Sequence, residues 1–207
     1  MSEIKKLDYS FYARPDPIRI AKELLGKILI TRFDDVLTSG RIVETEAYAG
    51  VTDRASHAFG GRRTKRTEIM YQKGGTAYVY LCYGIHHLFN IVTNEREIPH
   101  AILIRSVEPL EGIETMLTRT GKKKLDWTLT KGPGNVSKAL GLSTDHSAKS
   151  LLSRQIYLAD DGFKVAKNQI GITTRIGVGY AGEDAKLPYR FMIRKNKYVS
   201  GNRGRKQ

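Results

Sequence analysis

Short runs rich in β-branched and aromatic residues, separated by brief polar stretches, constrain the fold of this chain most strongly. Five of them follow one another: KILITRF (27–33), RIVETEAY (41–48), TAYVYLCY (76–83), LFNIV (88–92) and AILIRSV (101–107). The first two are joined by DDVLTSG, which has the composition of a turn. Strands this close in sequence favour hairpins, so the pattern predicts a mainly antiparallel sheet.

Helical patterns cover less of the chain. We expect helices at PIRIAKELLG (17–26), EPLEGIETMLTR (108–119) and GNVSKALGL (134–142), and further strands at QIYLAD (155–160) and YRFMIR (189–194). The 207 residues show neither an internal repeat nor a sharp shift in composition. We therefore predict one α+β domain spanning residues 1–207, with a basic and flexible tail from about residue 195.

The charge balance indicates the class of partner. Lys and Arg number 35 against 21 Asp and Glu, which gives a formal net charge of +14. Such a surface attracts phosphates and makes nucleic acid the leading partner, while solubility or an anionic membrane is the alternative explanation. One cysteine, no secretion signal and no run of eighteen apolar residues favour an intracellular protein outside the membrane. It would be cytoplasmic and nucleoid-associated in a bacterium, or nuclear in a eukaryote.

Two glutamates interrupt the apolar run RIVETEAY. Because side chains alternate along a strand, Glu44, Glu46 and Tyr48 are expected on one face. That face is either the solvated side of an antiparallel sheet or a functional surface. A carboxylate repels a bound phosphate, so on a DNA-binding surface its presence indicates a reaction that needs an anion.

Tyrosines mark the run TAYVYLCYG. Alternation places Tyr78 and Tyr80 on one face, and Gly84 allows a turn directly after Tyr83. Tyr83 is therefore expected at the exposed tip of a hairpin, where an aromatic ring can stack on bases or enter between base pairs. Packing in the sheet is the alternative for all three rings and the preferred interpretation for Tyr78.

The loop at 54–68 is basic. It carries His57 and then four cations that can contact phosphates, or that simply form a solvated surface: Arg62, Arg63, Lys65 and Arg66. No histidine or cysteine pair has a zinc spacing, and the chain contains no Walker loop, dinucleotide fingerprint or nucleophile elbow. We therefore expect neither a metal nor a cofactor.

Several of these motifs together resemble the alkyladenine (3-methyladenine) DNA glycosylase family. The motifs are RIVETEAY, ASHAFGGRRTKR (55–66), TAYVYLCYG, Asn90, IRSVEPLEG (104–112), GPGNVSKALG (132–141) and TTRIGVGYAG (173–182). They occur in the expected order and extend the resemblance from about Arg14 to about Ile193. The resemblance implies a curved, mainly antiparallel sheet flanked by helices, with a protruding β-hairpin.

The resemblance also implies an activity. A family member flips an alkylated or deaminated purine out of double-stranded DNA and hydrolyses its N-glycosidic bond with an activated water, without a cofactor. By motif position Glu46 is the general base, and Arg105 and the main-chain carbonyl of Ile176 help to hold the water. The implied flipped-base pocket and wedge consist of Tyr48, His57, Tyr80 and Asn90, with Tyr83 filling the gap in the duplex.

Two other readings stay open. One is a noncatalytic nucleic-acid-binding protein of the same fold, for which basic patches and aromatic rings suffice. The other is a bifunctional glycosylase and lyase with an amine nucleophile, although no motif places a lysine beside Glu46. Glu44 has no implied catalytic role, and we expect it to contact a basic side chain or to support the site. No obvious apolar patch is visible in the sequence, which favours a monomer.

Overall fold

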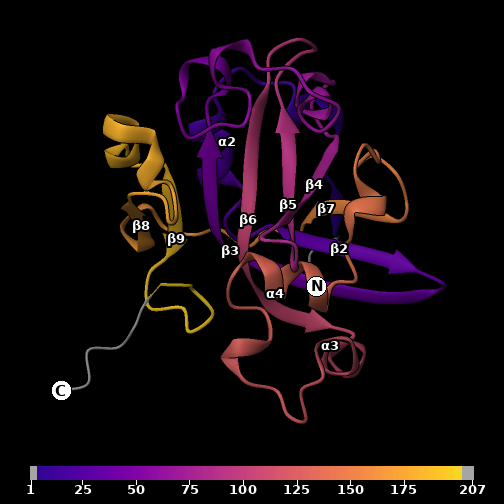
Figure 1. The fold of residues 1–207 in the computed structure, drawn as a ribbon. Coiled ribbons are helices and arrows are strands. Elements are labelled where there is room, and N and C mark those ends of the chain that lie inside the picture. Colours follow the sequence, from indigo (N-terminus) through magenta and orange to yellow (C-terminus); the bar gives the residue numbers. More distant parts are fainter. Residues whose placement is uncertain (1–3, 202–207) are drawn as a thin grey trace.

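The computed structural model describes residues 4–201, and Figure 1 shows a strongly curved sheet with helices around its edges. The strands are β1 (Lys5–Lys6), β2 (Ile28–Phe33), β3 (Val36–Tyr48), β4 (Ala77–Cys82), β5 (His86–Thr93), β6 (His100–Glu111), β7 (Ile156–Asp160), β8 (Ile170–Thr173) and β9 (Arg190–Ile193). Their order is β1-β7-β2-β3-β6-β5-β4, with β9 pairing β3 and β8. All strand pairs formed within residues 4–201 are antiparallel, so the predicted α+β fold with a mainly antiparallel sheet is confirmed.

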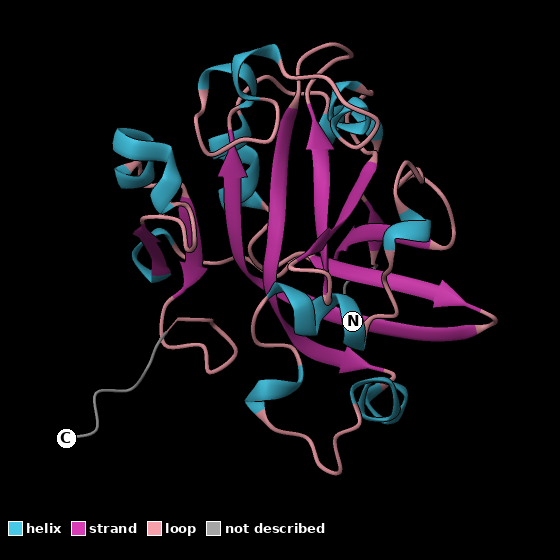
Figure 2. Cartoon of the chain, in the orientation of Figure 1, coloured by secondary structure: helices cyan, strands magenta, loops and turns pink. Residues whose placement is uncertain are grey.

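Helices are short and lie outside the sheet (Figure 2). The α-helices are α1 (Tyr9–Tyr12), α2 (Pro17–Glu23), α3 (Ile113–Thr120) and α4 (Pro133–Ala139). Residues 4–201 also contain seven 3₁₀ helices: η1 (Gly50–Thr52), η2 (Phe59–Gly61), η3 (Thr67–Tyr71), η4 (Trp127–Leu129), η5 (Thr144–His146), η6 (Lys167–Gln169) and η7 (Gly179–Lys186). Within residues 4–201, no helix combines the length and apolar composition required to cross a bilayer.

The main core joins helices to one side of the sheet. Ile20 of α2, Leu24 directly after α2, Val136 of α4 and Phe89 of β5 are all fully buried in it. Asp16 accepts hydrogen bonds from the N–H groups of residues 18 and 19, and Pro17 occupies the first turn, so the sequence starts α2 where its apolar face can pack.

The long strand β3 is the centre of the sheet. One edge pairs with β6 along most of its length, while the other pairs with β2 over residues 36–41 and then with β9 over residues 44–46. Register shifts occur around Glu44, which indicate local β-bulges. Because neighbours lie on both edges and the C-terminal segment covers it, the carboxyl half of β3 is buried.

Two predicted element boundaries were wrong. The turn DDVLTSG is only Asp34 and Asp35, whose φ angles of 49° and 61° lie in the left-handed region that Asp tolerates, and the strand resumes at Val36. The segment 108–111, expected to begin a helix, continues β6. Pro109 is accepted there because β5 pairs with β6 only as far as Leu103, which leaves this part of β6 at an edge.

The sequence predicted a flexible tail from about residue 195, and this prediction is wrong for residues 195–201. Tyr198 and Val199 are buried against Val43 and Met192, and Ser200 is also buried. The remaining tail residues, 202–207, lie outside the described part of the chain.

Candidate active site

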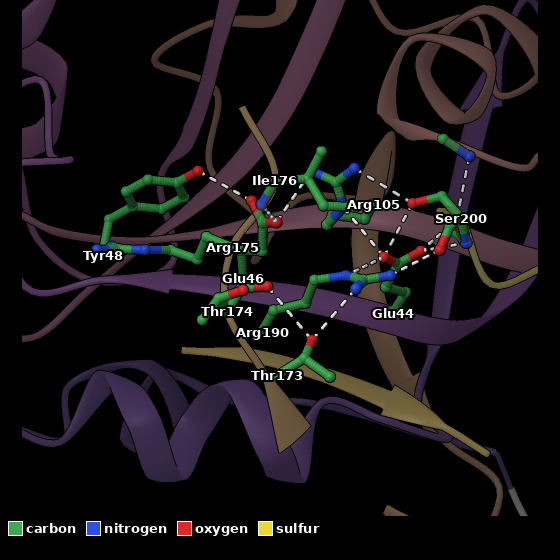
Figure 3. Close-up of polar contacts among 12 residues, drawn as sticks. Glu44, Glu46, Tyr48, Arg105, Thr173, Thr174, Arg175, Ile176, Arg190 and Ser200 are labelled. Carbon is green, nitrogen blue, oxygen red and sulfur yellow. Dashed lines mark hydrogen bonds and ion pairs between the residues drawn. The ribbon is translucent and has the colours of Figure 1, made fainter. Parts of the chain in front are cut away.

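The carboxylate of Glu46 is completely buried and held by three donors (Figure 3). Its Oε1 accepts from the main-chain N–H of Ile176 at 2.8 Å and pairs with Nη1 of Arg105 at 3.1 Å. Its Oε2 accepts from the hydroxyl of Tyr48 at 2.9 Å. Of the two alternatives for this strand face, the solvated one is thus wrong for Glu46, whose carboxylate is buried and whose polar partners offset the lost hydration.

Glu44 lies on the opposite side of the Arg105 guanidinium from Glu46. Arg105 Nε donates to Glu44 Oε1 at 3.1 Å, and Arg190 Nε donates to the same oxygen at 2.7 Å. Oε2 accepts from the Ser106 hydroxyl at 2.8 Å and from the Ser200 N–H at 2.7 Å. The expectation that Glu44 contacts a basic side chain is confirmed, and it contacts two.

The surroundings of Glu44 and Arg105 favour the charged form of each side chain. Burial by itself raises the pKa of Glu44, but Arg105, the Ser200 N–H and Arg190 together hold that pKa below its ordinary value. Burial also works against the charge of Arg105, whereas Glu46 and Glu44 raise its pKa above the ordinary value. Arg105 is therefore a permanent cation between two carboxylates.

A second buried ion pair fixes the segment that carries Ile176. Both terminal nitrogens of the Arg175 guanidinium donate to the carboxylate of Asp53, Nη2 at 2.9 Å, and they also donate to the carbonyls of Ala47 and Asp184. The guanidinium also lies 4.9 Å from the ring centre of Tyr48. Arg175 thereby joins the Ile176 segment to the strand that carries Glu46.

An aromatic pocket opens next to Glu46. It is lined by Tyr48, Ala55, His57, Met70, Tyr78, Tyr80, Asn90, Ala101 and Tyr180. The rings of His57 and Tyr80 meet edge to face with centroids 4.7 Å apart, and Tyr78 lies 5.5 Å from Tyr80. Tyr48 belongs to both features, because its ring lines the pocket and its hydroxyl bonds Glu46.

The polar groups of the pocket are mostly neutral. Burial, followed by Arg66 and Arg62, lowers the pKa of His57 to about 4, so its imidazole is uncharged at pH 7. Its Nδ1 lies 2.8 Å from the hydroxyl of Tyr78, whose pKa burial raises to about 12. Burial, then Glu46, raises the pKa of Tyr48 well above its ordinary value, so this hydroxyl remains a donor.

The hairpin of β4 and β5 exposes Tyr83 at its tip, where Tyr83 is 90% exposed. Its φ of 50° is in the left-handed region, which is costly for an aromatic residue, and Gly84 follows with a φ of 72°. The predicted position at a hairpin tip is confirmed. An exposed aromatic ring on a strained backbone is typical of a residue that serves contact with a ligand rather than packing.

The basic loop divides into bound and free cations. Arg63 forms ion pairs with Glu68 and Glu97 and lies over the ring of Tyr71, so its guanidinium already has partners in this structure, and its role as a phosphate contact stays a prediction. Arg62 and Lys65 are exposed, as is Arg66, which lies 5.8 Å from the ring centre of Tyr80. Within residues 4–201, no group of three or more His, Cys, Asp or Glu could hold a metal ion.

The residues predicted for catalysis and for the base pocket converge around one cavity, whereas Tyr83 and the four cations of the basic loop do not line it. Tyr48, His57, Tyr80 and Asn90 line it, Glu46 and Arg105 lie behind Tyr48, and Ile176 bonds Glu46 through its N–H. The sequence interpretation missed Arg190, Ser200 and the pocket role of Tyr78. Only Tyr78 had a usable signal, since it shares a strand face with Tyr80.

Comparison with known proteins identifies the family and several relatives of this chain. The sequence profile of the family described as Methylpurine-DNA glycosylase (MPG) matches residues 10–197. A protein of Chlamydia felis (strain Fe/C-56) is 44% identical over 196 residues, covering 93% of this chain and 100% of the relative. A protein of Clostridium perfringens (strain 13 / Type A) is 41% identical over 203 residues, covering 94% and 98%. Each carries the provisional name 3-methyladenine DNA glycosylase.

A third relative, from Bdellovibrio bacteriovorus, carries the same provisional name and is 44% identical over 196 residues, covering 94% of this chain and 98% of its own. The profile match leaves out only short segments at the two ends of the chain, and it includes β3, the β4–β5 hairpin, β6 and the Ile176 segment. The chain therefore belongs to the methylpurine-DNA glycosylase family.

Proposed function

We propose that this protein flips damaged purines out of duplex DNA and hydrolyses their N-glycosidic bonds with water, leaving an abasic site for base excision repair. One observation carries the proposal: Tyr48 connects an aromatic pocket to a buried carboxylate that Arg105 and the Ile176 N–H hold in place. Family membership and the names of the relatives support a DNA glycosylase role in DNA repair.

The chemistry explains why Glu46 is retained in a protein of charge +14. Breaking the bond between purine and sugar develops oxocarbenium-like positive charge, which a nearby carboxylate stabilises while it accepts a proton from the attacking water. The repulsion between Glu46 and DNA phosphates acts on the ground state as well. Because the stabilisation grows as the bond breaks, the carboxylate accelerates the reaction.

The pocket suits a flat heterocycle. Aromatic side chains form much of its wall, and they come from Tyr48, His57, Tyr78, Tyr80 and Tyr180. Weakened pairing lowers the few kcal/mol needed to extrude a damaged nucleotide, and a cationic alkylpurine stacks favourably on tyrosine rings. Neutral His57 adds no charge that would repel such a base.

Tyr83 is the proposed wedge. A flipped nucleotide leaves a gap in the base stack, and an aromatic ring that projects from a hairpin tip can fill it. Arg62, Lys65 and Arg66 are the proposed phosphate contacts, whereas Arg63 would first have to leave its two glutamate partners. The protein is proposed to act on DNA as a monomer.

The hydrolytic route is favoured over a lyase. The direct polar partners of Glu46 in the described residues are Tyr48, Arg105 and Ile176, and none of them is a lysine that could form a Schiff base. Among the described residues, no lysine lines the base pocket either.

Single-turnover assays on duplex oligonucleotides that contain hypoxanthine or ethenoadenine, and on methylated DNA, test the proposal. We expect release of free base and an alkali-labile abasic site, with no covalent protein–DNA adduct after borohydride treatment. Tight binding of all the lesions without base release would instead identify a noncatalytic DNA-binding protein. A borohydride-trapped adduct would contradict hydrolysis by water alone.

A further inference from the structure

Arg105 is fixed from three sides, and only one of its contacts is to Glu46. Nη1 pairs with Glu46 at 3.1 Å, Nε bonds Glu44 at 3.1 Å, and Nη2 bonds the Ser200 hydroxyl at 3.2 Å. The position of the guanidinium beside Glu46 therefore depends on two groups that do not line the base pocket.

The outer part of the cluster is closed by the C-terminal segment. Ser200 donates its N–H and its hydroxyl to the two oxygens of Glu44, at 2.7 and 2.9 Å, and its carbonyl accepts from Arg190 Nη2 at 2.6 Å. Arg190 lies opposite Glu46 in the pairing of β9 with β3. Figure 3 shows these contacts continuing from Tyr48 through Glu46 and Arg105 to Glu44 and Ser200.

We infer that Glu44, Arg190 and Ser200 form a positioning network that acts on Glu46 through Arg105. The inference rests on the proposed function and adds three residues to it, none of which lines the base pocket. Two carboxylates and two guanidiniums share one buried cluster, so their formal charges cancel. Removal of one charge leaves an imbalance that is weakly screened, because all four side chains are less than a tenth exposed.

Other groups facing Glu46 are unchanged by substitutions in this network. They come from every element packed around the carboxylate: Tyr48 of β3, Tyr80 of β4, Tyr180 of η7, and Arg175 with its partner Asp53. Glu44 and Arg190 therefore provide a pair of opposite charges that can be removed singly or together while the other groups facing Glu46 stay the same.

The test is the pH dependence of single-turnover base release by the full chain. The rate falls on the acid side of the pH–rate profile, and this part of the curve is its acid limb. Glu44→Gln removes a negative charge, which favours the anionic form of Glu46, so the acid limb should move to lower pH by about one unit. Arg190→Gln removes a positive charge, and the acid limb should move to higher pH by a similar amount. The double variant Glu44→Gln/Arg190→Gln restores the balance, and its acid limb should return toward the wild-type position.

Two matched variants separate charge from geometry. Ser200→Ala keeps both main-chain bonds and all four charges but loses the hydroxyl, so we expect a rate about threefold to tenfold lower with an unmoved acid limb. Asp161→Asn removes a carboxylate from the ion pair with Arg41, outside the site, and should leave both rate and acid limb unchanged. Melting temperatures show which variants are folded, and the Ser200 and Asp161 variants avoid removing a fully buried charge.

Opposite shifts of the two single variants, reversed in the double variant, would support the network. Shifts in the same direction, or rate losses that follow only the melting temperatures, would overturn it and leave the proposed function standing. If Glu44→Gln or Arg190→Gln does not fold, full wild-type activity of Ser200→Ala would overturn the positioning role of Ser200. If the wild type itself releases no base, the proposed function fails, and this inference fails with it.

Discussion

Replacement of Asp53 by alanine should strongly destabilise the protein. Asp53 is the anionic partner of Arg175, and the side chains of the pair are 2% and 0% exposed. The same carboxylate also accepts hydrogen bonds from the N–H groups of Ala49 and Ala55, each at 3.0 Å. Asp53→Ala therefore leaves a buried guanidinium without its counterion and two N–H groups without their acceptor.

The size of the effect follows from these contacts. Removal of one partner of a buried ion pair typically costs about 3–5 kcal/mol. Arg175 retains bonds to the carbonyls of Ala47 and Asp184, which favours the lower end of that range. For a chain of this size each kcal/mol lowers the melting temperature by about 2–4 °C, so we expect a decrease of about 6–12 °C.

Thermal unfolding followed by circular dichroism measures this decrease, and base release at a temperature where both proteins are folded measures its consequence for the site. Release should slow, because Arg175 precedes Ile176, whose N–H bonds Glu46. Adding Arg175→Met to Asp53→Ala removes the unpaired charge and should recover part of the stability. A decrease below about 3 °C for Asp53→Ala, or no recovery in the double variant, would refute this reasoning.

Two further substitutions test the hairpin tip and the pocket. Tyr83→Gly relieves the positive φ and should leave the protein at least as stable, yet it should slow base release much more than it weakens nonspecific DNA binding; equal losses would contradict a wedge. His57 has a pKa lowered to about 4 against about 6.5 in the unfolded chain, so its contribution to stability, present above pH 6.5, is lost as the pH falls toward 4. Between pH 7 and pH 5, urea unfolding should therefore show about 2 kcal/mol more loss for wild type than for His57→Gln, and equal losses would rule out the depressed pKa.

Local patterns in the sequence predicted seven of the nine described strands, all but β1 and β8, and several residues that converge on the pocket. Period-two alternation placed Glu46 with Tyr48 and Tyr78 with Tyr80, and the dipeptide Tyr83-Gly84 marked the hairpin tip. These features depend on neighbours in sequence, which explains why they could be read without a structure. Their roles in catalysis came from the family resemblance, because alternation does not distinguish a catalytic carboxylate from a structural one.

Long-range contacts could not be predicted in this way. Ser200 meets Glu44 across 156 residues, and the Lys, Asn and Gly around it indicated a flexible tail. Burial of Glu44 and Glu46 results from β9 and the C-terminal segment covering β3, which no pattern within RIVETEAY contains. Likewise, the segment 108–111 was expected to begin a helix, and only the edge position of β6 at that point explains why the strand continues through Pro109.

Single-turnover base release by wild type and by Glu46→Gln, at matched salt, tests the central claim most directly. Glutamine fits the site, since its oxygen can accept from Arg105 and Ile176 while its amide donates to the Tyr48 hydroxyl. We expect the variant to bind lesion-containing duplex as tightly as wild type, or more tightly. It should release base at least about a hundredfold more slowly, which is the rate loss expected when one general base is removed. Wild-type rates of release by a folded Glu46→Gln protein would contradict the assignment of Glu46 as the base that activates water.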